Sequence, residues 1–163
     1  MFQNPYMLLG SNIAERRRTL IMMTYKFYDT CSLLLKANHL FDEENVVVAV
    51  SSISLQELED IKTAYNKDAE IKYSARKVLR ELNEHMGEFD IYVYKESMME
   101  PITKKGFDHI TNDLRILACA FDYDTNIHPD ETIFVTNDLA LKAIANCFFG
   151  DDSIESVNEE ALD

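Results

Sequence analysis

The sequence predicts an α/β fold, a three-layer sandwich in which a central parallel β-sheet is flanked by helices. Short β-branched apolar runs alternate with helical patterns along the chain, and acidic residues follow directly where two of these runs end. Alternating strands and helices are typical of βαβ units, whose crossovers are almost always right-handed. We therefore expect one parallel sheet with helices on its faces.

The first half of the predicted domain contains two strands. A short buried strand from Tyr25 ends on the carboxylate of Asp29, and a helix follows from Ser32 to about Asn38. The second strand covers Val46 to Val50. Ser54-Leu55-Gln56-Glu57 then matches the Ser-x-x-Glu capping box, a role in which Glu57 needs no catalytic function. The apolar stripe of this helix comprises Leu55, Leu58, Ile61 and Tyr65.

The second half continues the alternation. A helical pattern over 69–86 precedes Gly87, a residue that suits a helix end, and a third strand over 90–94. The stretch 95–111 has no period, so we expect a functional loop that passes near the site. Asn112 is the expected cap of the next helix. The remaining expected elements are a polar connector over 122–131, a strand over 132–135 and a helix over 139–148.

Length and composition favour a single soluble globular domain. The chain has 163 residues, of which 47% are hydrophobic and 28% charged. Residues 1–23 show no clear period and are expected to form an N-terminal arm of uncertain structure. A single folded α/β domain is predicted over 24–150, and residues 151–163 are expected to form an acidic C-terminal tail.

The formal net charge of -13 argues against binding to nucleic acid through bulk charge, because phosphates are held mainly by Lys and Arg. A local basic set nevertheless lies between residues 61 and 80. Either these side chains contact a phosphate backbone, or they form an ordinary solvated helix face. The candidate RNA contacts are Lys62, Lys72, Arg76, Lys77 and Arg80.

The cysteines and the apolar segments point to a cytoplasmic protein. Cys31, Cys119 and Cys147 have neither paired nor metal-like spacing, and their odd number suggests reduced thiols. No apolar run approaches the roughly 18 residues of a membrane span, and the N-terminal segment lacks the order of an export signal.

Four acids lie at or near predicted helix starts, and they suggest a metal site. Asp29 and Asp138 directly follow strands, whereas Glu57 and Asp113 open helices. Each one alone is explained as a cap or first-turn residue, but the carboxyl ends of parallel strands are where such sheets bind ligands. Converging carboxylates repel one another unless a cation neutralises them, and Mg²⁺ or Mn²⁺ prefers oxygen ligands. Metal-assisted phosphodiester hydrolysis is the reaction class that this cluster supports best.

The four acids belong to four short motifs, which follow one another as Asp29-Thr30-Cys31-Ser32-Leu33-Leu34, Ser54-Leu55-Gln56-Glu57-Leu58, Asp113-Leu114-Arg115-Ile116-Leu117-Ala118 and Thr136-Asn137-Asp138-Leu139-Ala140-Leu141-Lys142. Motifs in this order resemble the PIN domain, and most of all the PIN module that precedes the ATPase of PhoH-like proteins. The resemblance covers about residues 25–150.

The resemblance implies a Mg²⁺- or Mn²⁺-dependent endoribonuclease that hydrolyses single-stranded RNA. Its acidic quartet, both catalytic and metal-binding, would be Asp29, Glu57, Asp113 and Asp138, while Thr30 and Thr136 would orient carboxylates or water. Two positions depart from the family pattern, which often has Asn at Cys31 and an Asp or Asn at Ala140. The sequence lacks the Gly-x-x-x-x-Gly-Lys-Ser/Thr motif, so the PhoH-like ATPase itself is missing, and the chain is either a stand-alone protein or part of a longer one.

Other interpretations stay open at this stage. The first is a catalytically silent PIN-fold module that binds RNA or a protein. A phosphotransfer domain is another, although the haloacid-dehalogenase pattern needs a second Asp where Cys31 stands. A toxin paired with an antitoxin is a biological variant of the nuclease. Expected partners are therefore single-stranded RNA, an antitoxin or ATPase domain, and a second copy of the chain.

Overall fold

The computed structural model describes residues 22–162, so the expected arm over 1–23 lies almost entirely outside the described residues. Within this range a five-stranded sheet has the order β3-β2-β1-β4-β5, and all neighbouring strands are parallel. The predicted parallel sheet is therefore confirmed. The strands are β1 (Thr24–Tyr28), β2 (Val46–Ser51), β3 (Asp90–Tyr92), β4 (Thr132–Val135) and β5 (Ile154–Glu155).

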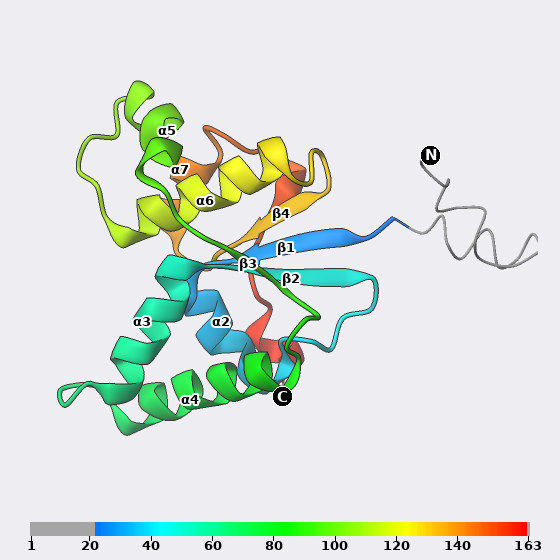
Figure 1. Cartoon of the computed structure of the whole chain (residues 1–163), viewed down its shortest axis with the longest axis vertical. Helices are drawn as coiled ribbons and strands as arrows, with labels where there is room; N and C mark the ends of the chain where they lie inside the picture. Colours follow the sequence, from blue (N-terminus) through cyan, green and yellow to red (C-terminus); the bar gives the residue numbers. More distant parts are fainter. Residues whose placement is uncertain (1–21, 163) are drawn as a thin grey trace, which may run out of the picture.

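Helices cover both faces of the sheet and complete the three-layer sandwich (Figure 1). On one side lie α2 (Thr30–Lys36), α3 (Ser52–Thr63) and α4 (Ala69–Glu84), and on the other α5 (Glu100–Lys104), α6 (Asn112–Asn126) and α7 (Leu139–Ala145). No helix among residues 22–162 combines the length and apolar character needed to cross a membrane. Short 3-10 helices are η2 (Ala37–His39), η3 (Glu96–Met99), η4 (Asp151–Ser153) and η5 (Glu159–Leu162).

β1 lies at the centre of the sheet and is buried on both faces. Phe27 packs with Phe134 in the cluster on the α6 side, whereas Tyr28 packs with Val50 and Val135 in the cluster on the α2 side. These side chains are at most 1% exposed, and burying each contributes roughly 1.5–3 kcal/mol. The alternation of side chains along a strand thus fixes β1 between two cores, with its carboxyl end held in place.

The register of the sheet brings three polar residues together at its carboxyl edge. Tyr28 pairs with Val50 on β2 and with Val135 on β4. The next residue along each strand is therefore Asp29, Ser51 or Thr136, and Asp29 N donates to Val135 O at 3.1 Å. The same register fixes which side chains meet at this edge.

Several predicted boundaries were wrong for local reasons. The expected loop over 95–111 contains η3 and α5, and only 105–111 lacks a helix. Pro101 lies in the first turn of α5, where a helix has no N–H bond to lose. Helix α6 extends to Asn126, well into the expected polar connector, and its N-cap is Thr111 rather than Asn112. Its cap bond runs from Leu114 N to Thr111 Oγ1 at 3.3 Å.

Two further helix starts also differ from the prediction. The N-cap of α3 is Ser51, whose Oγ accepts from Ser54 N at 3.0 Å. The capping box proposed for Ser54 and Glu57 is therefore wrong, and Glu57 lies in the second turn of α3. Helix α2 starts at Thr30, two residues before its predicted start, because Asp29 caps it. Helix α7 ends at Ala145, short of the expected 148.

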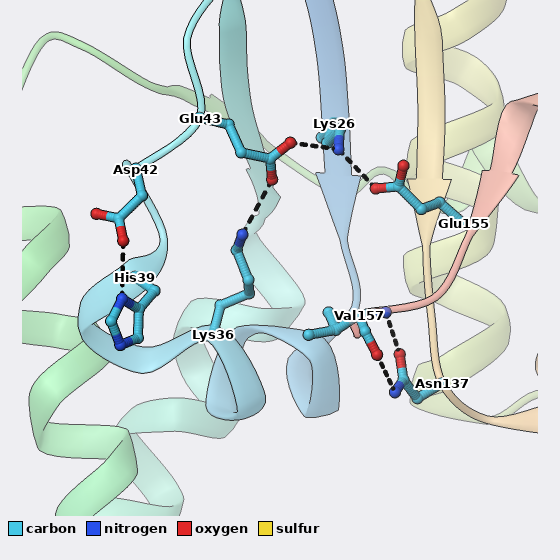
Figure 2. A network of polar contacts seen from close by, with 8 residues as sticks. All are labelled: Lys26, Lys36, His39, Asp42, Glu43, Asn137, Glu155 and Val157. Carbon is cyan, nitrogen blue, oxygen red and sulfur yellow. Dashed lines mark hydrogen bonds and ion pairs between the residues drawn. The ribbon is translucent and has the colours of Figure 1, made fainter. Parts of the chain in front are cut away.

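The segment expected as an acidic C-terminal tail contains the fifth strand of the sheet. Lys26 Nζ on β1 lies 2.6 Å from Glu155 Oε2 and 2.7 Å from Glu43 Oε2 (Figure 2). The side chain of Asn137 bonds the backbone of Val157 twice, at 2.6 Å to its N and 3.0 Å to its O. Residues 151–162 are therefore part of the folded domain, because ion pairs and backbone pairing offset their acidic character.

Candidate active site

Asp29 is the most deeply buried of the four predicted acids, at 2% exposure. It is the N-cap of α2, and its Oδ1 accepts from Ser32 N at 2.8 Å. A side-chain oxygen at this position satisfies a helix N–H that otherwise lacks a partner. Asp29 therefore has a structural role, but its second oxygen remains for other contacts.

Thr136 connects that second oxygen to Asp138. The Thr136 hydroxyl donates to Asp29 Oδ2 at 2.6 Å and accepts from Asp138 N at 3.1 Å. Asp138 is itself the N-cap of α7, where its Oδ1 accepts from Leu141 N at 3.0 Å. One buried hydroxyl thus contacts two acids that are distant in sequence, and the orienting role expected for Thr136 in catalysis stays a prediction.

Glu57 enters the site from α3 and is held by Thr30. Thr30 Oγ1 donates to Glu57 Oε1 at 2.8 Å and lies 3.0 Å from Ser54 Oγ. Because Ser51 caps α3, the carboxylate of Glu57 has no capping role. Glu57 is half-buried and is held by this hydrogen bond, whereas the orienting role of Thr30 in catalysis stays a prediction. Ser54, which sequence reasoning treated only as a cap, supports this contact.

Asp113 lies in the first turn of α6, exposed to solvent. Burial of the carboxyl group raises the pKa of Asp113, and the carboxylates of Asp138, Asp29 and Glu57 raise it further. Each of the other three predicted acids thus acts on Asp113 through like-charge repulsion. The structure brings the quartet into one electrostatic site.

Cys31 lies within the same site. Its thiol pKa is raised by burial and then by all four carboxylates, Asp29, Asp113, Glu57 and Asp138. A raised pKa keeps the thiol protonated, so Cys31 adds a neutral group rather than a further negative charge.

Helix capping accounts for only half of the quartet. Asp29 and Asp138 cap helices, whereas Glu57 and Asp113 bond no helix end as a cap. Glu57 accepts from the Thr30 hydroxyl, and Asp113 lies in the first turn of α6, where a helix start favours negative charge. These local roles do not offset the repulsion among all four carboxylates, which a cation would relieve.

The donor set fits a hard divalent cation. All four groups offer carboxylate oxygens, the ligands that Mg²⁺ and Mn²⁺ prefer, and a cation would relieve the repulsion that raises the pKa of Asp113. Among residues 22–162, no three His, Cys, Asp or Glu side chains are already gathered as a metal-binding group. Cation binding would therefore draw the carboxylates closer together, and Asp113, which is exposed, has room to move.

A pocket of about 340 Å³ opens beside Asp113 and Asp138. One of its walls is formed by residues of the 106–111 segment, so the irregular stretch predicted to pass near the site does so. The sequence analysis named no individual residue there, because the segment was identified as a loop only by the lack of a helical or strand period in its apolar residues. The unanticipated side chains are those of Phe107, Asp108 and His109, and Ala140 lines the pocket as well.

The candidate RNA-contact residues lie on α3 and α4. Lys62 Nζ forms an ion pair with Glu59 Oε1 at 2.8 Å, and Lys77 Nζ lies 4.8 Å from the ring centroid of Tyr73. The buried face of α4 packs inward through Ala75, Val78 and Leu82, leaving the basic side chains half-buried or exposed. Their contact with RNA stays a prediction. The other members of the set are Lys72, Arg76 and Arg80.

The PIN domain family matches residues 27–148, which is more than half of the chain, and the chain therefore belongs to this family. A crystal structure of VapBC2 from Rickettsia felis, bound to a DNA fragment from the VapBC2 promoter, has a similar fold, with a TM-score of 0.50 at 18% identity. The match covers 83% of this chain and 100% of that chain. A domain of a functionally unknown protein from Methanocaldococcus jannaschii DSM 2661 gives a TM-score of 0.50 at 18% identity, covering 82% and 89%. No curated protein matches the chain.

Proposed function

We propose that this PIN domain is a metal-dependent endoribonuclease that hydrolyses phosphodiester bonds of single-stranded RNA. One observation carries the proposal: the Thr136 hydroxyl contacts both Asp29 and Asp138, while Thr30, the neighbour of Asp29, binds Glu57, so three acids from separate elements meet at one edge of the sheet. Burial, and then these three carboxylates, raise the pKa of the fourth acid, Asp113. Membership of the PIN domain family supports a nuclease-type function.

The quartet Asp29, Glu57, Asp113 and Asp138 would hold Mg²⁺ or Mn²⁺. When bound, such an ion lowers the pKa of a water molecule and stabilises the leaving oxygen of a phosphodiester. Thr136 keeps Asp29 and Asp138 in place, and Thr30 does so for Glu57. These hydroxyls orient carboxylates before substrate arrives, so little reorganisation is left for the reaction.

Substitution of Asp29 by Asn tests the proposal. Asn still caps a helix, so Asp29→Asn keeps the bond from Ser32 N while it removes one negative charge. We expect Mn²⁺ affinity and cleavage of a labelled single-stranded RNA to fall by at least about 100-fold, the upper end of the loss caused by removing an outer partner of a metal ligand.

Asp68→Asn is the matched control. Asp68 is also an N-cap aspartate, accepting from Glu70 N at 2.7 Å, but it is exposed and caps α4 away from the quartet. This variant should bind metal and cleave RNA like the wild type. Full activity of Asp29→Asn would contradict the proposal, whereas an inert wild type would favour the second candidate.

That second candidate is a catalytically silent PIN-fold module that binds RNA or a protein. Cys31 favours it, because a thiol within the influence of all four carboxylates takes a position that the PIN family often fills with Asn. RNA binding without cleavage, in the presence of Mg²⁺ or Mn²⁺, would distinguish this module from the nuclease.

Several finer expectations stay predictions. They concern the special likeness to PhoH-like proteins, contact of RNA with the basic set on α3 and α4, and a cytoplasmic location. An antitoxin partner, an ATPase domain and a homodimer are likewise expected from the resemblance alone. Gel filtration and purification of the chain from its native source would test the partners.

A further inference from the structure

The pocket beside Asp113 and Asp138 shares these two carboxylates with the quartet and extends beyond them along the 106–111 segment and α7. Its volume of about 340 Å³ falls in the range of roughly 300–1,000 Å³ found for small-molecule sites. The two shared carboxylates place it next to the phosphodiester that the quartet would hydrolyse. Whatever group flanks that phosphodiester would therefore face the pocket.

The walls of the pocket suit a flat, largely apolar group. Phe107, Leu114, Leu141 and Ile144 supply apolar surface. The Phe107 ring is half-buried and packs on Phe148, with 6.4 Å between ring centroids, so one aromatic wall is preformed. Aromatic walls of this kind bind single-stranded nucleic acid by stacking on its bases.

The ionisable side chains of the pocket are mostly hydrogen-bond acceptors. Asp108 contributes a carboxylate from outside the quartet, and Asp113 and Asp138 contribute two from within it. His109 and Thr111 also line the pocket, and among its described lining residues none is Lys or Arg. Adenine, cytosine and guanine each carry an exocyclic amino group that donates hydrogen bonds, whereas the one donor of uracil, N3–H, lies between two carbonyl acceptors. A carboxylate-rich pocket therefore favours an amino-bearing base, because the carbonyl oxygens of uracil would face carboxylates and be repelled by them.

We propose that this pocket is a base-binding subsite that takes one unpaired base of the RNA and prefers an amino-bearing base to uracil. The proposal rests on the nuclease function and gives it a reason for single-strand specificity. A base that is stacked and paired within a duplex has no free face or edge to offer, whereas an unpaired base has both.

Filling the pocket from α7 tests this directly. Ala140 lines the pocket and is exposed, so Ala140→Phe occupies the space without replacing a carboxylate of the quartet or a core side chain. Ala143 lies on the same helix, is also exposed and does not line the pocket, which makes Ala143→Phe the matched control. Phe107→Leu is a third variant that keeps apolar bulk but removes the aromatic face.

The probes are AMP and UMP, which contain no phosphodiester to hydrolyse, titrated by NMR into the full chain with diamagnetic Mg²⁺ present. We expect the wild type to bind AMP at least about tenfold more tightly than UMP, within the range of discrimination that hydrogen bonds to a base edge give. Ala140→Phe and Phe107→Leu should lose about tenfold in AMP affinity, and Ala143→Phe should not.

RNA cleavage by the same proteins separates this proposal from the nuclease function. If the wild type cleaves RNA but Ala140→Phe leaves AMP affinity and cleavage unchanged, the subsite is wrong and the nuclease stands. Equal affinity for AMP and UMP would also overturn the base preference. If AMP binds and Ala140→Phe weakens it while no RNA is cleaved, the base pocket stands and the nuclease function fails.

Discussion

At the scale of single residues, the site depends on hydroxyl groups as much as on acids. Thr136 is fully buried and serves two elements at once, since its Oγ1 donates to Asp29 and accepts from the backbone of Asp138. A buried polar group that loses its partner keeps the cost of desolvation. The stability of this corner therefore depends on one oxygen atom.

Replacing Thr136 by Val tests that dependence. Val has nearly the same shape, but it leaves Asp29 Oδ2 and Asp138 N without this partner. We expect the free energy of unfolding to fall by about 1–3 kcal/mol, measured by urea denaturation. Thr136→Ser, which restores the hydroxyl, should recover most of the loss. A Val variant as stable as the wild type would show that water replaces the hydroxyl.

At the scale of elements, an ion-pair network joins β1, α2 and β5. Lys26 and Lys36 are 7% and 8% exposed, and both lie against Glu43, at 2.7 Å and 2.9 Å. Although burial by itself raises the pKa of Glu43, hydrogen bonds from Lys26 and Lys36 hold it below its usual range. Among the described residues, Glu43 is the one acidic partner of Lys36, so the network depends on Glu43.

Glu43→Gln should lower the free energy of unfolding by about 1–3 kcal/mol, less than for a fully buried pair because Glu43 is partly exposed. Because the pKa of Glu43 is lower in the folded state than its ordinary value of 4.5, the ionised side chain stabilises the protein at pH values above 4.5. This contribution is lost as the pH falls through the lowered pKa. The difference between variant and wild type should therefore vanish in acid, as followed by thermal denaturation at several pH values.

Glu59→Gln controls for the loss of a surface ion pair, since Glu59 pairs with the half-buried Lys62 within α3. It should leave stability nearly unchanged at every pH. A loss in Glu43→Gln that persisted in acid would mean that packing, not charge, accounts for the effect.

At the scale of the whole molecule, the ionised carboxylate of Asp113 destabilises the folded protein in the absence of a cation. The pKa of Asp113 is raised in the folded state, so the folded protein holds this proton more tightly than the unfolded chain does. Stability therefore falls as pH rises from the ordinary value of 3.8 through the raised value. A net charge of -13 adds to the repulsion.

At neutral pH without metal, Asp113→Asn should consequently melt at a higher temperature than the wild type. The gain in the free energy of unfolding should be at most about 1 kcal/mol, because the group is exposed. Adding Mg²⁺ or Mn²⁺ should stabilise the wild type, by about 2.7 kcal/mol at a hundredfold excess over Kd, and the variant less. Asp68→Asn should respond to metal as the wild type does. Equal metal responses of Asp113→Asn and wild type would exclude Asp113 as a ligand.

The sequence by itself determined the layers, the order of the first four strands and of the helices other than α5, and the two capping acids, Asp29 and Asp138. These features depend on the period of apolar residues and on neighbours within four positions, which consecutive residues specify. The PIN resemblance also named all four acids. Prediction failed where local signals were ambiguous, as at the Ser54–Glu57 capping box and at Pro101, because each pattern suits more than one conformation.

Only the tertiary structure decided which distant groups meet. Thr136 reaches Asp29 across 107 positions because β1 and β4 pair in a register fixed by packing on both faces. The acidic C-terminal segment becomes β5 because Lys26 and Asn137 hold it, and the 106–111 segment forms a pocket wall because α5 ends before it. Such contacts follow from the balance of burial over the whole molecule, which no short stretch of sequence contains.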